Sequence, residues 1–136
     1  MKPMTSARAR SVLLALFISF LVVQLAAVVM IHRRMWPEDL QAIVLKLLAI
    51  YSVHLGVILG MYFAFYKTGA TRVAASAPAA IALCGIWNVL IAWRTVAFAL
   101  AAEDSPKELI DYLETVSSAS GFLVVGALAF FFAKSK

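Results

Sequence analysis

The sequence holds few groups that carry out chemistry: one cysteine, two histidines and seven acidic residues among 136. Because Cys84 stands alone, no intrachain disulfide can form. The acids occur in two short clusters, so the long apolar runs contain no carboxylate to complete a metal site. No nucleophile–base pair, phosphate-binding loop or carboxylate dyad is found either. We therefore expect a protein that is not an enzyme and that uses no metal or cofactor.

Apolar residues dominate what is present. They make up 64% of the chain, and the mean hydropathy is +0.94. A chain this short cannot hide so much apolar surface from water, whereas a bilayer can cover it. The apolar runs cover residues 11–31, 47–66, 78–100 and 115–133. Each reaches or approaches the roughly twenty residues that cross about 30 Å of hydrocarbon.

These runs predict one all-α membrane domain over residues 1–136, because backbone groups facing lipid must be paired within helices. The predicted helices are 11–32, 37–67, 76–101 and 106–133. Their short connections favour an up-down-up-down bundle of four transmembrane helices. The first run is too long for a signal peptide and has no small-x-small cleavage site, so we expect it to be an anchor.

Charge divides the connections into two groups. The acids are Glu38, Asp39, Glu103, Asp104, Glu108, Asp111 and Glu114. The basic residues of the remaining segments are Lys2, Arg8, Arg10, Lys67, Arg72, Lys134 and Lys136. Since basic residues collect on the cytoplasmic side, both termini are predicted cytoplasmic in a bacterial inner (plasma) membrane. The net charge of +5 then reflects topology, and no nucleic-acid partner is expected.

The helix starts on the acidic side carry local signals. Ser105-Pro106-Lys107-Glu108 has a capping serine, a proline at the first helical position and a capping-box glutamate. Pro37 followed by two acids predicts the start of the second helix. Gly69 suits its end, and Ser76 and Pro78 suit the start of the third helix.

Polar residues within the runs fall at one predicted depth. Counting about 1.5 Å per residue places them about 8–10 Å below the outer boundary. This predicted layer consists of Gln24, His54, Asn88 and Ser120. It can be interhelical hydrogen bonding or the lining of a polar vestibule that opens outward. A bis-histidine haem is not expected, because His32 lies about 10 Å nearer the surface.

Four interfacial charges lie above this layer: Lys46, Arg94, Asp111 and Glu114. Arg94 follows Trp93 and can be an interfacial anchor within an aromatic belt. Alternatively, it pairs with Glu114 or Asp111 and fastens the outer ends of the third and fourth helices.

Small residues repeat every four positions along the second helix: Ser52, Gly56, Gly60 and Ala64. We call these four residues the small-residue stripe. A stripe with a central GxxxG lets two helix backbones approach closely. Packing inside the bundle is the favoured interpretation, and a contact between molecules is the alternative. His54 points about 160° away from the stripe at 100° per residue.

Two segments resemble the small four-helix membrane subunit of tripartite ATP-independent periplasmic transporters. Arg34-Met35-Trp36-Pro37-Glu38-Asp39-Leu40 is similar to its outer turn, and Lys67-x-Gly69-x-x-Arg72-Val73 to its following cytoplasmic loop. The likeness lies within residues 34–73, and the third helix departs from the pattern. It implies a scaffold for a larger transporter subunit that does not itself bind substrate.

Two functions are therefore expected as alternatives. In the first, the chain is an assembly or interaction subunit of a homo-oligomer or of a larger membrane complex. In the second, it is a small oligomeric channel, a transporter, or a holin-like or defence-associated membrane protein with an outer polar vestibule. The apolar inner halves of the runs favour the first, because they leave no open pore within one protomer.

Overall fold

Four long helices and one short 3₁₀ turn make up the part of the chain that the computed structural model describes, residues 5–64, 76–101 and 105–134. The elements are α1 Ser6–Met30, η1 His32–Arg34, α2 Pro37–Ala64, α3 Ala77–Ala101 and α4 Pro106–Lys134. No strand occurs in these residues. The predicted all-helical class is confirmed for them, while Gly69 and the predicted end of the second helix at residue 67 lie outside the described ranges.

Each helix is long and apolar enough to cross a membrane. The helices contain 25 to 29 residues. At 1.5 Å per residue these lengths correspond to about 37–44 Å, which exceeds the roughly 30 Å of a hydrocarbon core. The described chain thus has the length and composition of a membrane protein with four spans.

Local capping explains where the helices begin. Ser105 and Glu108 form the predicted capping box: the Ser105 amide donates to Glu108 Oε2 at 2.9 Å, and the Glu108 amide donates to Ser105 Oγ at 3.2 Å. Pro37 and Pro106 are the first residues of α2 and α4, as predicted. The start predicted for α1 was five residues late, since Thr5 Oγ1 accepts from the Arg8 amide at 3.4 Å and caps the helix there.

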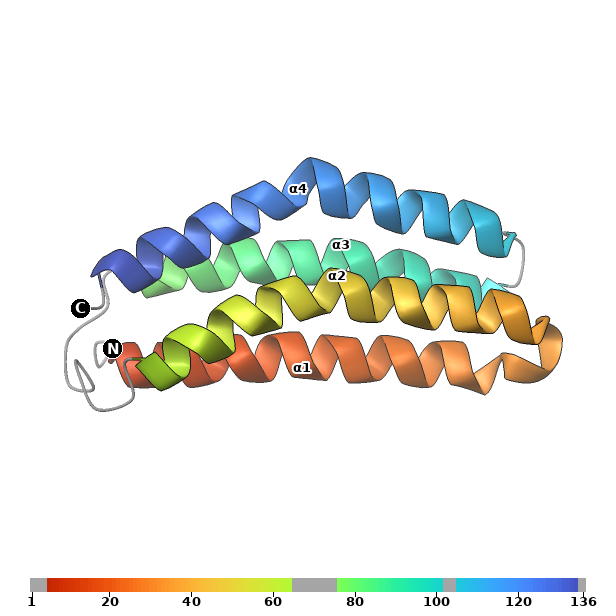
Figure 1. Ribbon diagram of the computed structural model, residues 1–136, viewed down its shortest axis with the longest axis horizontal. Helices are drawn as coiled ribbons and strands as arrows, with labels where there is room; N and C mark the ends of the chain where they lie inside the picture. The colour runs from red at the N-terminus through yellow and green to blue at the C-terminus, as the bar shows by residue number, and fades with distance from the viewer. Residues whose placement is uncertain (1–4, 65–75, 102–104, 135–136) are drawn as a thin grey trace.

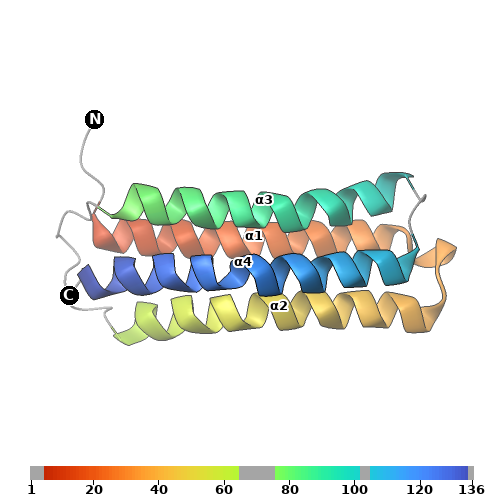
Figure 2. The ribbon, with the colours of Figure 1, turned by 90° about the horizontal axis from the view of Figure 1, so that it is seen from above.

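The helices lie side by side along one axis (Figures 1 and 2). Helix α1 packs against α2 and α3, and α4 packs against the same two helices, so the order around the bundle is α1–α2–α4–α3. The end of α1, the start of α2, the end of α3 and the start of α4 lie at one end of the bundle (Figure 1). The acids Glu38, Asp39, Glu108 and Asp111 therefore share that end.

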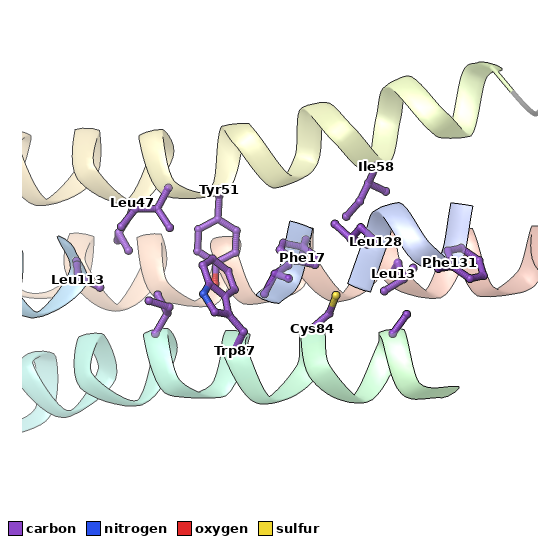
Figure 3. Close-up of a cluster of buried hydrophobic side chains, with 14 of the residues drawn as sticks. Leu13, Phe17, Leu47, Tyr51, Ile58, Cys84, Trp87, Leu113, Leu128 and Phe131 are labelled. Atoms are coloured by element: carbon purple, nitrogen blue, oxygen red, sulfur yellow. The ribbon is translucent and has the colours of Figure 1, made fainter. Parts of the chain in front are cut away.

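One seam of buried side chains from all four helices forms the core (Figure 3). Phe17, Tyr51 and Trp87 meet in its middle, with ring centroids 5.6–6.1 Å apart. The outer surface is also apolar: Val53 is 59% exposed and Phe122 is 66% exposed. Exposed apolar side chains over a whole bundle suit contact with lipid.

Helix α4 is bowed in Figure 1. Near its middle, Ser117 and Ser118 donate to the Glu114 carbonyl at 3.1 and 2.7 Å, and Ser120 donates to the Val116 carbonyl. Serine hydroxyls that bond back to the preceding turn commonly bend a helix. The bow of α4 coincides with this cluster of serines.

Candidate functional site: a buried polar network beside His54

A hydrogen-bonded network joins three helices in the core. Gln24 Nε2 on α1 donates to Tyr51 Oη on α2 at 2.6 Å. Tyr51 Oη donates to Asn88 Oδ1 on α3 at 2.9 Å. Thr95 Oγ1, also on α3, donates to Gln24 Oε1 at 3.1 Å, so the bonded side chains form the series Thr95–Gln24–Tyr51–Asn88. All four side chains are fully buried. We call Gln24, Tyr51, Asn88 and Thr95 the core network.

The remaining donors of the core network bond to the backbone. Gln24 Nε2 also donates to the Phe20 carbonyl at 3.1 Å, and Asn88 Nδ2 donates to the Cys84 carbonyl at 2.8 Å. A buried polar group without a partner is costly, and here the groups serve as partners for one another. This geometry favours the interpretation of Gln24 and Asn88 as interhelical hydrogen-bonding residues over a vestibule open to water.

His54 lies one helical turn after Tyr51, on the same face of α2. Its ring stacks on Phe17, with centroids 5.7 Å apart and planes at 20°, and its centroid is 4.6 Å from that of Trp87. The side chain is 5% exposed. Its Nδ1 lies 2.9 Å from the Ile50 carbonyl oxygen, and its Nε2 is buried without a hydrogen-bond partner. His54 therefore borders the core network and holds one unused polar atom.

Ser120 is not brought into this site. It is half-buried, and its hydroxyl donates to the Val116 carbonyl on its own helix. The α4 residue that meets the site is Gly121, whose position faces the edge of the His54 ring. The predicted four-residue layer is therefore wrong for its α4 member, because residue 121 and not residue 120 points toward α2.

Lys46, Glu114 and Arg94 each contact a neighbouring helix. Glu114 Oε2 pairs with Lys46 Nζ at 3.0 Å, which links α4 to α2. The Arg94 guanidinium lies over the Tyr112 ring, 5.8 Å from its centroid, which links α3 to α4. Its pairing with Glu114 or Asp111 stays a prediction. Asp111 is exposed. The Lys46 and Glu114 side chains are 28% and 64% exposed, so this ion pair is a rim contact.

The small-residue stripe does not pack inside the bundle. Ser52, Gly56, Gly60 and Ala64 are all exposed. A Cβ added at Gly56 or Gly60 would meet nothing within 4 Å. The favoured expectation of an internal helix contact was therefore wrong. Apolar side chains on the opposite face of α2, such as Leu47, Tyr51 and Ile58, form its internal contact instead.

Two residues of the site, Tyr51 and Thr95, were not predicted from the sequence. Each of the three side chain–side chain links involves Tyr51 or Thr95, but both residues were counted with the apolar runs. Helical spacing could have found both. Tyr51 precedes His54 by three residues and Thr95 follows Asn88 by seven, and each interval returns to the same helix face.

Comparison of the chain with protein-family models, with curated proteins and with solved structures gives no match.

Proposed function

We propose that this chain is a non-enzymatic, multi-pass protein of a bacterial inner membrane that acts as an assembly or interaction subunit, within a homo-oligomer or a larger membrane complex. The observation that carries the proposal is the exposed small-residue stripe on α2. Its residues are open to the outside, and nothing lies within 4 Å of a Cβ built at Gly56 or Gly60.

The way in which helices associate in lipid supports a helix as the partner of this stripe. In lipid, helices associate through close van der Waals packing, and small residues let two backbones approach. A stripe that plays no part in the protomer's own packing is available for a helix of another subunit. The resemblance around Trp36–Leu40 adds a transporter scaffold as the kind of complex.

The orientation belongs to the same proposal. The four helices cross the membrane up-down-up-down, with both termini cytoplasmic and the acidic end of the bundle facing outward. The excess of Lys and Arg in the segments without acids supports this orientation. The outer end then carries Lys46, Arg94 and Glu114 at the level of the headgroups, where charged side chains are solvated.

The buried core network argues against the alternative of a vestibule or channel within one protomer. Its four side chains are fully buried and bonded to one another, so they line no passage for water or ions. The proposal therefore places the function at the outer surface of the bundle.

The experiment is Gly56→Leu combined with Gly60→Leu, measured as complex mass in mild detergent by native mass spectrometry. We expect the complex to dissociate while the thermal midpoint of the subunit stays level or rises, since leucine has a higher helix propensity than glycine. The matched control is Gly126→Leu on α4, another position with open space around its Cβ. An unchanged complex mass in the double variant, or the same dissociation in the control, contradicts the proposal.

A further inference from the structure

An open groove runs between α2 and α4, beside the core network. Its volume is about 250 Å³, and its lining includes Ile50, Val53, His54, Ser117, Gly121 and Phe122. Val53 and Phe122 at its rim are exposed, so the groove opens to the outside of the bundle within the apolar part of both helices. It lies on the face of α2 away from the small-residue stripe.

One polar atom at this groove has a defined chemistry. The Ile50 carbonyl can only accept a hydrogen bond, so the 2.9 Å contact places the proton of neutral His54 on Nδ1. Nε2 then carries a lone pair and is an acceptor. It is buried without a partner, in a side chain that is 5% exposed.

The surrounding side chains leave this acceptor unused. The Ser117 and Ser118 hydroxyls donate to the Glu114 carbonyl on their own helix. Gly121 has no side chain, and a Cβ at that position would lie 3.9 Å from Nε2, which is ordinary van der Waals contact. A buried acceptor without a donor is uncommon in folded proteins, and the neighbouring Trp87 Nε1, which is itself buried without a partner, does not supply the donor.

We propose that the α2–α4 groove binds a neutral, lipid-soluble molecule with a ring hydroxyl, of the phenol or hydroquinone class, whose O–H donates to His54 Nε2. The acceptor requires a donor in the ligand. The apolar rim and the position within the spans require a ligand that partitions into lipid without charge. The volume is below the roughly 300–1,000 Å³ of sites for drug-sized ligands, so it fits a single ring with its tail in lipid.

The first test compares 4-propylphenol with 4-propylanisole, its methyl ether, which keeps the ring and lacks the donor. Both are titrated into the purified full-length protein in detergent micelles. Binding is followed by the ¹⁵N shift of His54 Nε2, distinguished from His32 with a His32→Gln variant. We expect the phenol to move the Nε2 signal and to bind about tenfold more tightly than the ether, the usual worth of one hydrogen bond. Equal affinities, or an unmoved Nε2 signal, overturn the proposal.

The second test blocks the acceptor with a side chain that fits. Gly121→Ala places a methyl group in front of Nε2 at contact distance, and Gly126→Ala is its control on the same helix in open space. We expect Gly121→Ala to reduce phenol affinity to the level of the ether, and Gly126→Ala to leave it unchanged. Both variants should remain folded, since alanine favours helix over glycine.

Gly121→Ser complements Gly121→Ala. The serine hydroxyl extends one bond beyond the Cβ atom and can donate to His54 Nε2 within the protein. We expect a higher thermal midpoint than for Gly121→Ala and no phenol binding. If Gly121→Ala instead lowers the mass of the native complex and leaves phenol affinity unchanged, a helix of another subunit occupies the groove and the proposal is wrong. Unchanged phenol affinity in both Gly121 variants also contradicts the proposal.

Discussion

Replacing Tyr51 by phenylalanine removes one oxygen atom from the centre of the core network. That oxygen accepts from Gln24 Nε2 at 2.6 Å and donates to Asn88 Oδ1 at 2.9 Å. The ring itself remains in contact with Phe17 and Trp87, so little packing is lost. The substitution therefore isolates the hydrogen bonds from the apolar core.

The expected loss of stability depends on which hydrogen bonds Gln24 and Asn88 keep in the variant. Gln24 Nε2 retains its bond to the Phe20 carbonyl, whereas Asn88 Oδ1 loses its O–H donor in a fully buried position. Interhelical hydrogen bonds in membranes average about 0.6 kcal/mol and reach about 1.7 kcal/mol. An acceptor left unsatisfied adds about 1–3 kcal/mol where nothing replaces the donor. We expect Tyr51→Phe to lower the free energy of unfolding by about 1–3 kcal/mol.

The assay is reversible unfolding in mixed micelles, with helix content as the signal. Tyr112→Phe is the control: its hydroxyl donates to the Leu90 carbonyl at 3.3 Å in a partly exposed position, so we expect a loss within about 0.5 kcal/mol. A double-mutant cycle of Tyr51→Phe with Asn88→Ala should give a coupling of about 0.5–1.5 kcal/mol. If Tyr51→Phe is no more destabilising than Tyr112→Phe and the coupling vanishes, the core network does not stabilise the bundle.

Three further outcomes are expected. A C-terminal phosphatase fusion, active only in the periplasm, should be inactive, and protease outside spheroplasts should not cut residues 67–72; activity or cutting would reverse the orientation. Glu114→Lys should cost about 0.5 kcal/mol, as exposed ion pairs do, and Lys46→Glu should restore part of it; no restoration would contradict the pair. Cys84, fully buried in α3, should resist maleimide in the folded protein and react on unfolding; rapid labelling of folded protein would contradict the described packing.

Sequence predicted the fold well because its signals are local. The capping box at Ser105 and Glu108 and the proline at the start of α2 depend on a few neighbouring residues, and the structure contains both. The start of α1 was predicted too late because the prediction followed the apolar run. Apolar length marks where hydrocarbon begins, whereas the helix continues to its cap at Thr5.

The site was less predictable, because it depends on which way each helix is turned. Gln24 and Asn88 were chosen for polarity and depth, whereas Tyr51, which joins them, was counted among the hydrophobic residues of its run. The small-residue stripe fits a close contact on either side of α2, so its spacing alone could not decide between core and exterior. Ser120 and Gly121 point about 100° apart around α4. A small error in the rotation of this helix therefore decides which of the two residues faces His54.

The order of helices around the bundle gives the polar contacts a further role. Helices α1 and α2 form one helical hairpin, and α3 and α4 form another, packed through the α1–α3 and α2–α4 contacts. The bonds Tyr51–Asn88, Thr95–Gln24 and Lys46–Glu114 all cross from one hairpin to the other. A slip of one hairpin by a helical turn, about 5.4 Å, would break all three together. In lipid, apolar side chains gain no hydrophobic stabilisation from contact with another helix, so these three bonds, together with side-chain packing, fix the height at which the two halves of the chain dock.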